Sequence, residues 1–178
     1  MISFGTKVFH LSDAVQRPFS EILRAQLRHL PKHSKVMLSF GEIDCRLHEG
    51  FLAVAEARNI DLKDLIAKTI AGYLRFVGGL ALEMQHQIFI LNVPAPLHSS
   101  KSSAAENASV ANIVHLFNQN LAYQMHQSDM GLVDLHKFTC GSEGFSNRRF
   151  HCDDSHLDGR ALQEIAVSYT HLTLPTKA

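Results

Sequence analysis

The stretch Val36-Met-Leu-Ser-Phe-Gly-Glu-Ile-Asp-Cys-Arg46 indicates the fold most directly. Its first half is an apolar run that ends at Gly41, and the charged residues Glu42, Asp44 and Arg46 follow at once. An apolar run of this length that stops at a glycine is typical of a buried parallel strand. Loops at the carboxyl ends of parallel strands build the binding sites of α/β proteins. We therefore expect these charged residues to lie at the functional end of a sheet.

Apolar residues on either side of this stretch alternate between strand and helix patterns. Residues 7–11, 88–91 and 132–135 are predicted as further strands, and the prolines at 94 and 96 predict a loop after the second of them. Helical spacing predicts helices over 18–30, 62–77 and 110–125, with a short helix within 45–60. Gly78-Gly79 predicts a kink or an early end of the long helix, and residues 98–107 read as exposed. Asp158 is expected to cap a last helix that starts near Gly159. The order indicates an α/β fold with a mostly parallel sheet covered on both faces.

Composition narrows the classes of function. Lys and Arg number 17 and Asp and Glu also 17, so the formal net charge is zero and gives no electrostatic argument for nucleic acid or an anionic membrane. By inspection no stretch approaches the ~20 apolar residues of a membrane span. The odd cysteine count (Cys45, Cys140 and Cys152) favours reduced thiols and a cytoplasmic location.

The last residues, 167–178, have a different character. Val-Ser-Tyr-Thr-His-Leu-Thr-Leu-Pro-Thr-Lys-Ala looks like the translation of sequencing-adapter DNA, and the alternative is an ordinary polar tail. We interpret 167–178 as a non-native tail and 1–166 as one domain, which fits a chain of 178 residues.

A second informative segment is Asp153-Asp-Ser-His156-Leu-Asp-Gly159. Acyl transfer requires a general base that works near neutral pH, which imidazole provides, and a carboxylate that orients the ring. An Asp three residues before a His can fold back onto the ring from within a loop. The alternative interpretation is a polar loop that caps the last helix.

These two segments together resemble the SGNH/GDSL hydrolases. The string ending Gly41-Glu-Ile-Asp44 is similar to their third conserved block, and residues 38–46 resemble a bacterial subgroup; Asp153-x-x-His156 is similar to the last block. The resemblance covers about residues 6–166. It implies a flavodoxin-like three-layer sandwich and ester hydrolysis or acyl transfer. It also implies that His156 is the base, that Asp153 orients it, and that Gly41 and Asp44 shape the floor of the site.

The sequence departs from the family pattern at three places. The Gly-Asp-Ser segment that supplies the nucleophile does not occur, and we expect it upstream of Met1. Ile43 stands where the family has an oxyanion-binding Asn, and His10-Leu-Ser12 stands where a second-block Gly is expected, although the backbone N–H of Ser12 is still available. Arg46 is our candidate for the missing donor. Glu42 and Asp44 then either position Arg46 or the substrate, or belong to a structural salt bridge.

Two other chemistries use the same regions. Cys45 with His48, and His151, Cys152 and His156, carry side chains that bind zinc, but no Cys-x-x-Cys spacing accompanies them, so no metal or cofactor is expected. Cys45 beside Arg46 is a second candidate nucleophile, because a nearby cation lowers the pKa of a thiol; the alternative is a half-buried reduced cysteine.

The sequence thus predicts an ester hydrolase or acyltransferase domain of the SGNH type. Its expected substrate is a small-molecule or glycan ester, and it is expected to be inactive without the serine block. The alternatives are a noncatalytic SGNH-like binding domain in carbohydrate or cell-envelope biosynthesis and a metal-binding module.

Overall fold

A computed structural model describes residues 6–12, 17–141, 143–153 and 156–170. Its sheet contains three parallel strands in the order β1 (Lys35–Ser39), β2 (Gln87–Leu91) and β3 (Gly131–Val133). Val36 pairs with Ile88, and Ile90 pairs with Leu132. The predicted α/β class and the parallel sheet are therefore confirmed.

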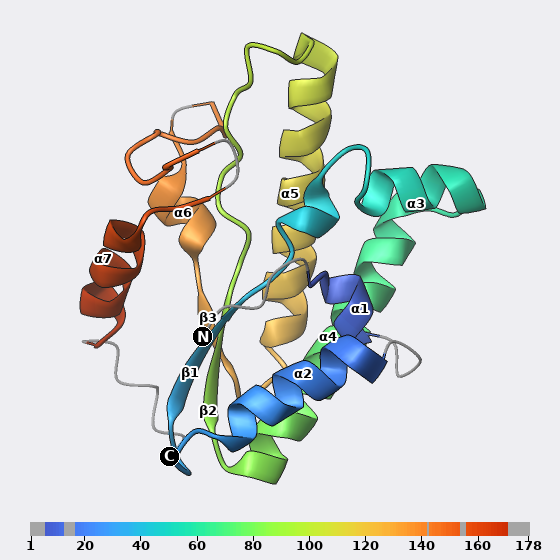
Figure 1. Ribbon diagram of the computed structural model, residues 1–178. Coiled ribbons are helices and arrows are strands. Elements are labelled where there is room, and N and C mark those ends of the chain that lie inside the picture. The colour runs from blue at the N-terminus through green and yellow to red at the C-terminus, as the bar shows by residue number, and fades with distance from the viewer. Residues whose placement is uncertain (1–5, 13–16, 142, 154–155, 171–178) are drawn as a thin grey trace.

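Helices connect and cover these strands (Figure 1). In chain order they are α1 (Val8–Ser12), α2 (Arg17–Arg28), the 3-10 turn η1 (Ile43–Cys45), α3 (Phe51–Arg58), α4 (Leu62–Met84), α5 (Ala104–Met125), α6 (Leu135–Thr139) and α7 (Gly159–Thr170). Figure 1 shows α4 and α5 on one side of the sheet and α7 on the other. Asp158 caps α7 as expected, because its carboxylate accepts the N–H of Arg160 at 2.8 Å.

The two faces of the sheet are covered to different extents. Alternate residues of β1 and β2 enter a large core with α1 to α5; these are Val36, Leu38, Ile88 and Ile90. On the other face, Leu91 and Val133 pack against Ala161 and Ile165 of α7. The outward side chains of β1, including Met37, are exposed. Among the described residues, α7 therefore covers β2 and β3, while the outward side chains of β1 are not covered by it.

The prediction of a strand at 7–11 is wrong, because this segment forms α1. The carboxylate of Asp44 accepts the backbone N–H groups of Val8 and Phe9, which a helix leaves unpaired in its first turn. Helix α1 then packs against α4 at Gly72, where a Cβ atom would lie 2.5 Å from the backbone oxygen of Ser12. A distant carboxylate and a close helix approach thus override the local strand preference.

Three other sequence predictions need correction. Helix α4 continues through Gly78-Gly79 to Met84, because the neighbouring Val77 and Leu80 are buried and their packing offsets the weak helix preference of glycine. The strand expected at 132–135 ends at Val133, since Asp134 accepts the N–H of Lys137 and starts α6. Residues 98–107 are not uniformly exposed: a Ser103–Glu106 capping box starts α5, and Asn107 is buried.

By length and composition alone α4 is long and apolar enough to cross a membrane, a test that a buried core helix also passes. Its apolar side chains do not form an exposed belt, however. Nine of its residues are buried, and it packs against α1, α3 and α5. This is the environment of a core helix.

Gly41, directly after β1, offers a test of this packing. Its φ angle is +113°, and an added Cβ would lie 2.7 Å from Cζ of Phe117 and 2.9 Å from Cγ2 of Val93. We expect Gly41→Ala to lower the free energy of unfolding by about 3 kcal/mol, because strain and overpacking add. Urea denaturation measures this change.

Gly144 provides the matched control. It also has a positive φ, +79°, but an added Cβ would meet no atom within 4 Å. Gly144→Ala should cost only the backbone strain, about 1 kcal/mol. Equal losses in the two variants would contradict a close contact between Gly41 and Phe117.

Candidate functional site

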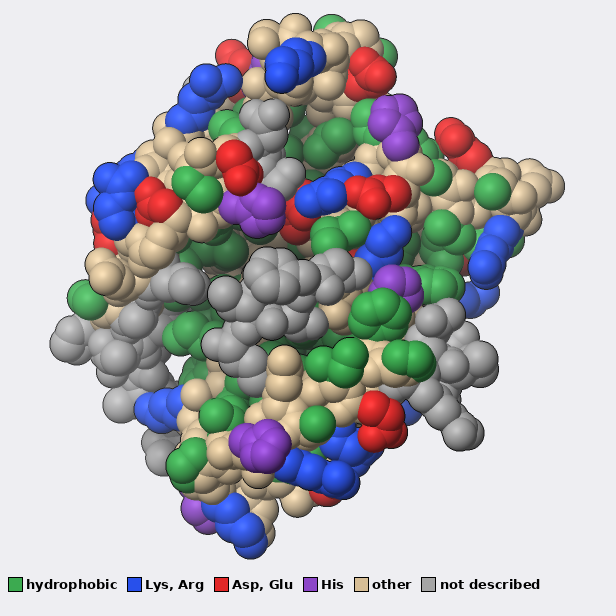
Figure 2. Space-filling model, viewed as in Figure 1, with side chains coloured by type: hydrophobic (Ala, Val, Ile, Leu, Met, Phe, Trp, Pro, Cys, Tyr) green, Lys and Arg blue, Asp and Glu red, His purple; other side chains and the backbone are tan. Residues whose placement is uncertain are grey.

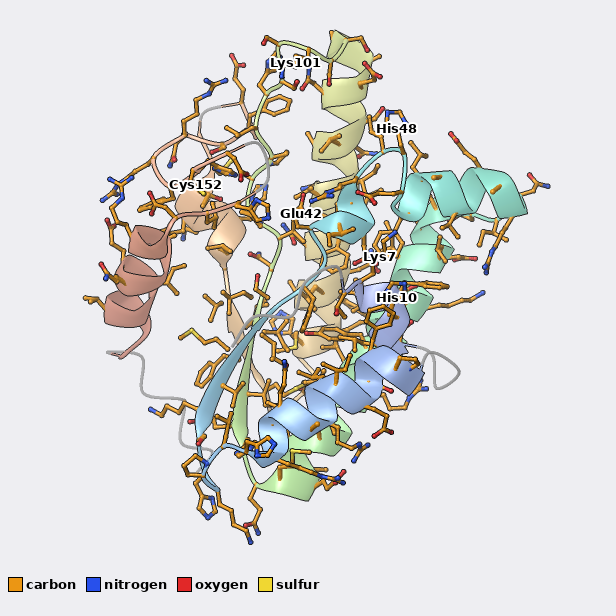
Figure 3. The ribbon with its side chains drawn as sticks, viewed as in Figure 1. Lys7, His10, Glu42, His48, Lys101 and Cys152 are labelled. Atoms are coloured by element: carbon orange, nitrogen blue, oxygen red, sulfur yellow. The ribbon has the colours of Figure 1, made fainter. Side chains whose placement is uncertain are left out.

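A cavity of about 270 Å³ opens at the carboxyl ends of β1 and β2, and we call it the first cavity. Its walls come from Glu42 and residues 45–48 after β1, residues 93–97 after β2, the N-terminal half of α5, and His151. Figure 3 shows Glu42 and His48 beside the upper part of α5, whereas Lys7 and His10 lie beside α1. The functional end that the sequence predicts therefore does contain a cavity.

The loop after β2 is held by hydrogen bonds from three other segments, two made by side chains and one by a backbone N–H. The amide of Asn118 in α5 accepts the N–H of Val93 at 2.9 Å and donates to its carbonyl at 2.8 Å. Thr139 Oγ1 accepts the N–H of Ala95 at 2.9 Å, and the backbone N–H of Ser146 donates to Pro96 at 2.8 Å. These bonds satisfy backbone groups that a strand would pair, so the proline-containing loop is rigid enough to form a wall.

Arg46 and Glu42 form a bidentate ion pair in the wall of the first cavity. Nε and Nη2 of Arg46 lie 3.0 and 2.9 Å from the two carboxylate oxygens of Glu42, and Nη1 lies 2.7 Å from Glu49. Figure 2 shows acidic, basic and histidine side chains side by side in the upper middle of this face. These carboxylates raise the pKa of Arg46, so its charge is fixed. Glu42 thus contacts Arg46, as the sequence suggested. This arrangement fits both interpretations, in which Glu42 positions Arg46 for the substrate or forms a structural salt bridge with it.

Asp44 does not take part in the Glu42–Arg46 ion pair and instead contacts the start of α1. Its side chain is buried, and its two oxygens accept the N–H groups of Val8 at 2.7 Å and Phe9 at 3.1 Å. Burial raises the pKa of Asp44, and the two backbone hydrogen bonds oppose that rise. Ser12 lies in the same helix, where its hydroxyl donates to the carbonyl of Phe9. The geometry therefore gives Asp44 a clear structural contact, while the predicted site roles of Asp44 and Ser12 remain predictions.

Cys45 is buried beneath the first cavity. Burial, followed by the charges of Asp44 and Glu42, raises the pKa of its thiol well above the ordinary value. The expected effect of Arg46 is thus outweighed, and the thiolate that a nucleophile requires is disfavoured. Among the described residues, no group of three or more His, Cys, Asp or Glu side chains is arranged to hold a metal ion.

Asp153 and His156 lie at the facing ends of two segments, residues 150–153 and 156–158, that are bonded to each other. His151 and Leu157 form a backbone bridge between these segments, and the N–H of Cys152 donates to the carbonyl of His156 at 3.0 Å. Nδ1 of His156 lies 2.8 Å from Oδ2 of Asp153, and Oδ1 of Asp153 accepts the backbone N–H of His156 at 2.7 Å. The side chains are 72% and 55% exposed. The structure thus brings the predicted pair together, at the surface.

Asp153 also lines a second cavity, of about 330 Å³. The first and second cavities share Leu97, Ser99 and His151. In Figure 3, Lys101 and Cys152, which both line the second cavity, lie at the same end of the molecule as Glu42. Asp153 therefore belongs to the wall of a cavity that adjoins the first one, whereas His156 is among the described lining residues of neither cavity.

Sequence reasoning missed three residues that organise these walls: Asn107, Asn118 and Ser146. The amide of Asn107 accepts the N–H of Ser99 and donates to its carbonyl, both at 2.9 Å. For the two asparagines a signal exists in their spacing, because Asn107 precedes Val110 by three positions and Asn118 follows Val114 by four, which places both near the apolar face of α5. Ser146 carries no such signal, because its partner His151 is identified only by the loop geometry.

No protein-family model matches the chain, and no curated protein matches it. Its function is therefore inferred from the geometry of the site.

The contrast between Asp44 and Glu42 generates a prediction. We expect Asp44→Ala to lower the free energy of unfolding by about 2–3 kcal/mol, because two N–H groups at the start of α1 lose their acceptor. Glu42→Ala should cost at most about 1 kcal/mol, since its ion pair is about one-third exposed. Chemical denaturation of both variants checks this order, and the reverse order would contradict the structural contact of Asp44.

Proposed function

We propose that the chain is the greater part of an SGNH-type ester hydrolase or acyltransferase domain. The observation that carries the proposal is the contact of Asp153 with His156, in which Asp153 lines the second cavity, next to the first cavity at the carboxyl ends of β1 and β2. Ligand sites of α/β sheets lie at this end. The contact of a carboxylate with Nδ1 leaves Nε2 as the proton acceptor that a base requires.

The nucleophile is proposed to come from a Gly-Asp-Ser strand upstream of Met1. In the described part of the chain no serine hydroxyl is bonded to Nε2 of His156, and β1 pairs with β2 along one edge only. An unpaired edge of an apolar parallel strand is where a further strand adds. Such a strand would extend the sheet beside β1 and complete a flavodoxin-like three-layer sandwich.

The proposed reaction is acyl transfer in two halves. The serine Oγ attacks the ester carbonyl while Nε2 of His156 takes its proton, and Asp153 stabilises the imidazolium. The tetrahedral intermediate expels the alcohol, which receives the proton from His156. Water or an acceptor alcohol then attacks the acyl-enzyme by the same route. We propose acylated glycans or small-molecule esters as substrates, and a cytoplasmic location.

The proposed oxyanion donor is Arg46, because the position where the SGNH family has an Asn is occupied by Ile43. Ile43 in η1 has no side-chain donor, and three nitrogens of Arg46 donate to Glu42 and Glu49. A guanidinium has five N–H bonds, so two remain for an oxyanion. Because Ile43 weakens the case for catalysis, a noncatalytic SGNH-like binding domain in carbohydrate or cell-envelope biosynthesis is the second candidate.

The experiment that tests the proposal uses the chain completed with its upstream reading frame. We expect the completed protein to hydrolyse p-nitrophenyl butyrate, and His156→Ala to lower kcat by about 10²- to 10⁴-fold through loss of the general base. Steady-state kinetics measures the loss.

His115→Ala is the matched control, because His115 is an exposed histidine on α5 and should leave kcat unchanged. A continuous upstream frame without a Gly-Asp-Ser motif would contradict the hydrolase proposal. Ester hydrolysis that survives His156→Ala would contradict the role of the base.

Arg46 gives a separate prediction. If its free N–H groups hold the oxyanion, Arg46→Ala should lower kcat of the completed protein by about 10²-fold, because the donor acts on charge formed in the transition state. Glu49→Gln removes one exposed partner of Arg46 and should change kcat little. An Arg46→Ala variant with unchanged kcat would show that another group binds the oxyanion.

A further inference from the structure

Ser146 and His151 form a polar pair distinct from Asp153 and His156. Ser146 Oγ lies 2.8 Å from Nδ1 of His151, and it also accepts the backbone N–H of Arg148 at 3.0 Å. The backbone N–H of Ser146 donates to Pro96 at 2.8 Å, in the wall of the first cavity. The hydroxyl is thus fixed in place by backbone bonds on both sides of the loop.

The contact with Ser146 bears on which nitrogen of His151 carries the proton. Ser146 Oγ accepts the N–H of Arg148 and can accept a second hydrogen bond, so its contact with Nδ1 of His151 fits either direction. The direction that uses the proton of the hydroxyl makes Nδ1 the acceptor. A neutral imidazole that accepts at Nδ1 carries its proton at Nε2. Burial lowers the pKa of His151, although the charge of Asp153 opposes this, so the neutral ring is favoured near pH 7.

His151 stands where the first and second cavities meet, since it lines both. On one side of it part of the wall of the first cavity is apolar and is formed by Val93, Ala95, Val110 and Val114, while the Glu42–Arg46 ion pair forms another part. On the other side the second cavity includes Lys101 and Arg148. A ligand that spans the junction would therefore have an apolar end, a polar end and an atom beside His151 between them.

We propose that Nε2–H of His151 donates a hydrogen bond to the carbonyl oxygen of a bound acyl compound. The acyl chain occupies the first cavity, and the polar remainder of the ester or amide occupies the second. The choice of an acyl compound rests on the proposed function, whereas the donor and the two cavities do not. His151 is thus a binding residue positioned by Ser146.

The physical reason for this assignment is the position of His151. It lines both cavities and contacts Ser146, whereas Arg46 lines the first cavity only, where three of its N–H groups hold Glu42 and Glu49. A preorganised donor in a half-buried site favours a ligand with an acceptor over one without it, by about five- to tenfold in Kd.

Two measurements on the 178-residue chain test the proposal. Long-range ¹⁵N–¹H NMR correlation of the histidine rings should show the His151 proton on Nε2. Butyranilide should bind about five- to tenfold more tightly than N-butylaniline, which has similar size but no carbonyl oxygen. His151→Ala should abolish this preference, whereas His98→Ala, a histidine that lines the second cavity only, should retain it.

Ser146→Ala keeps the test decisive if His151→Ala fails to fold, because it removes only a hydroxyl. Without the hydroxyl, the proton of His151 should distribute between Nδ1 and Nε2, and the preference for butyranilide should fall. A proton on Nδ1 in the unaltered chain, or equal binding of the two probes, would overturn the proposal. Retained preference without ester hydrolysis by the completed protein would overturn the proposed function instead and leave His151 as a binding residue.

Discussion

The buried carboxylate of Asp44 is the contact on which the arrangement around the site depends. A carboxylate removed from water is costly unless its oxygens are bonded, and here two N–H groups of α1 supply those bonds. The contact joins residues 36 positions apart, between Val8 and Asp44. Because Asp44 lies in η1 directly after β1, the same contact fixes both the position of α1 on α4 and the path of the loop that carries Glu42 and Arg46.

This dependence explains which parts of the fold could be predicted from the sequence. The strands β1 and β2 and the helices α4 and α5 follow from apolar periodicity, because each buries a face of its own. The segment 7–11 could not be assigned in this way, because its helix is capped by a residue far along the chain and supported by the absence of a side chain at Gly72. The end of α4 is mispredicted at Gly78-Gly79 for a related reason. The helix continues because Val77 and Leu80 are buried against other elements, which local helix preference does not reveal.

The candidate site shows the same division between local and distant contacts. The contact of Asp153 with His156 could be predicted because the two residues are three positions apart and a loop can close over that distance. The bonds of Glu42 to Arg46 are equally local. The anchoring of the loop after β2 by Asn118, Thr139 and Ser146 could not be predicted, since it depends on how α5, α6 and a later loop pack around that strand.

The exposure of the Asp153–His156 pair limits both its contribution to stability and its ability to act as a base. An ion pair or hydrogen bond between side chains that are 72% and 55% exposed contributes little free energy. The pair is instead placed by the backbone hydrogen bonds between residues 150–153 and 156–158, and the buried Phe150 anchors the first of these segments by stacking on Phe138. A general base that stays in bulk water competes with solvent for its proton, so catalysis would require a neighbouring segment to cover the imidazole.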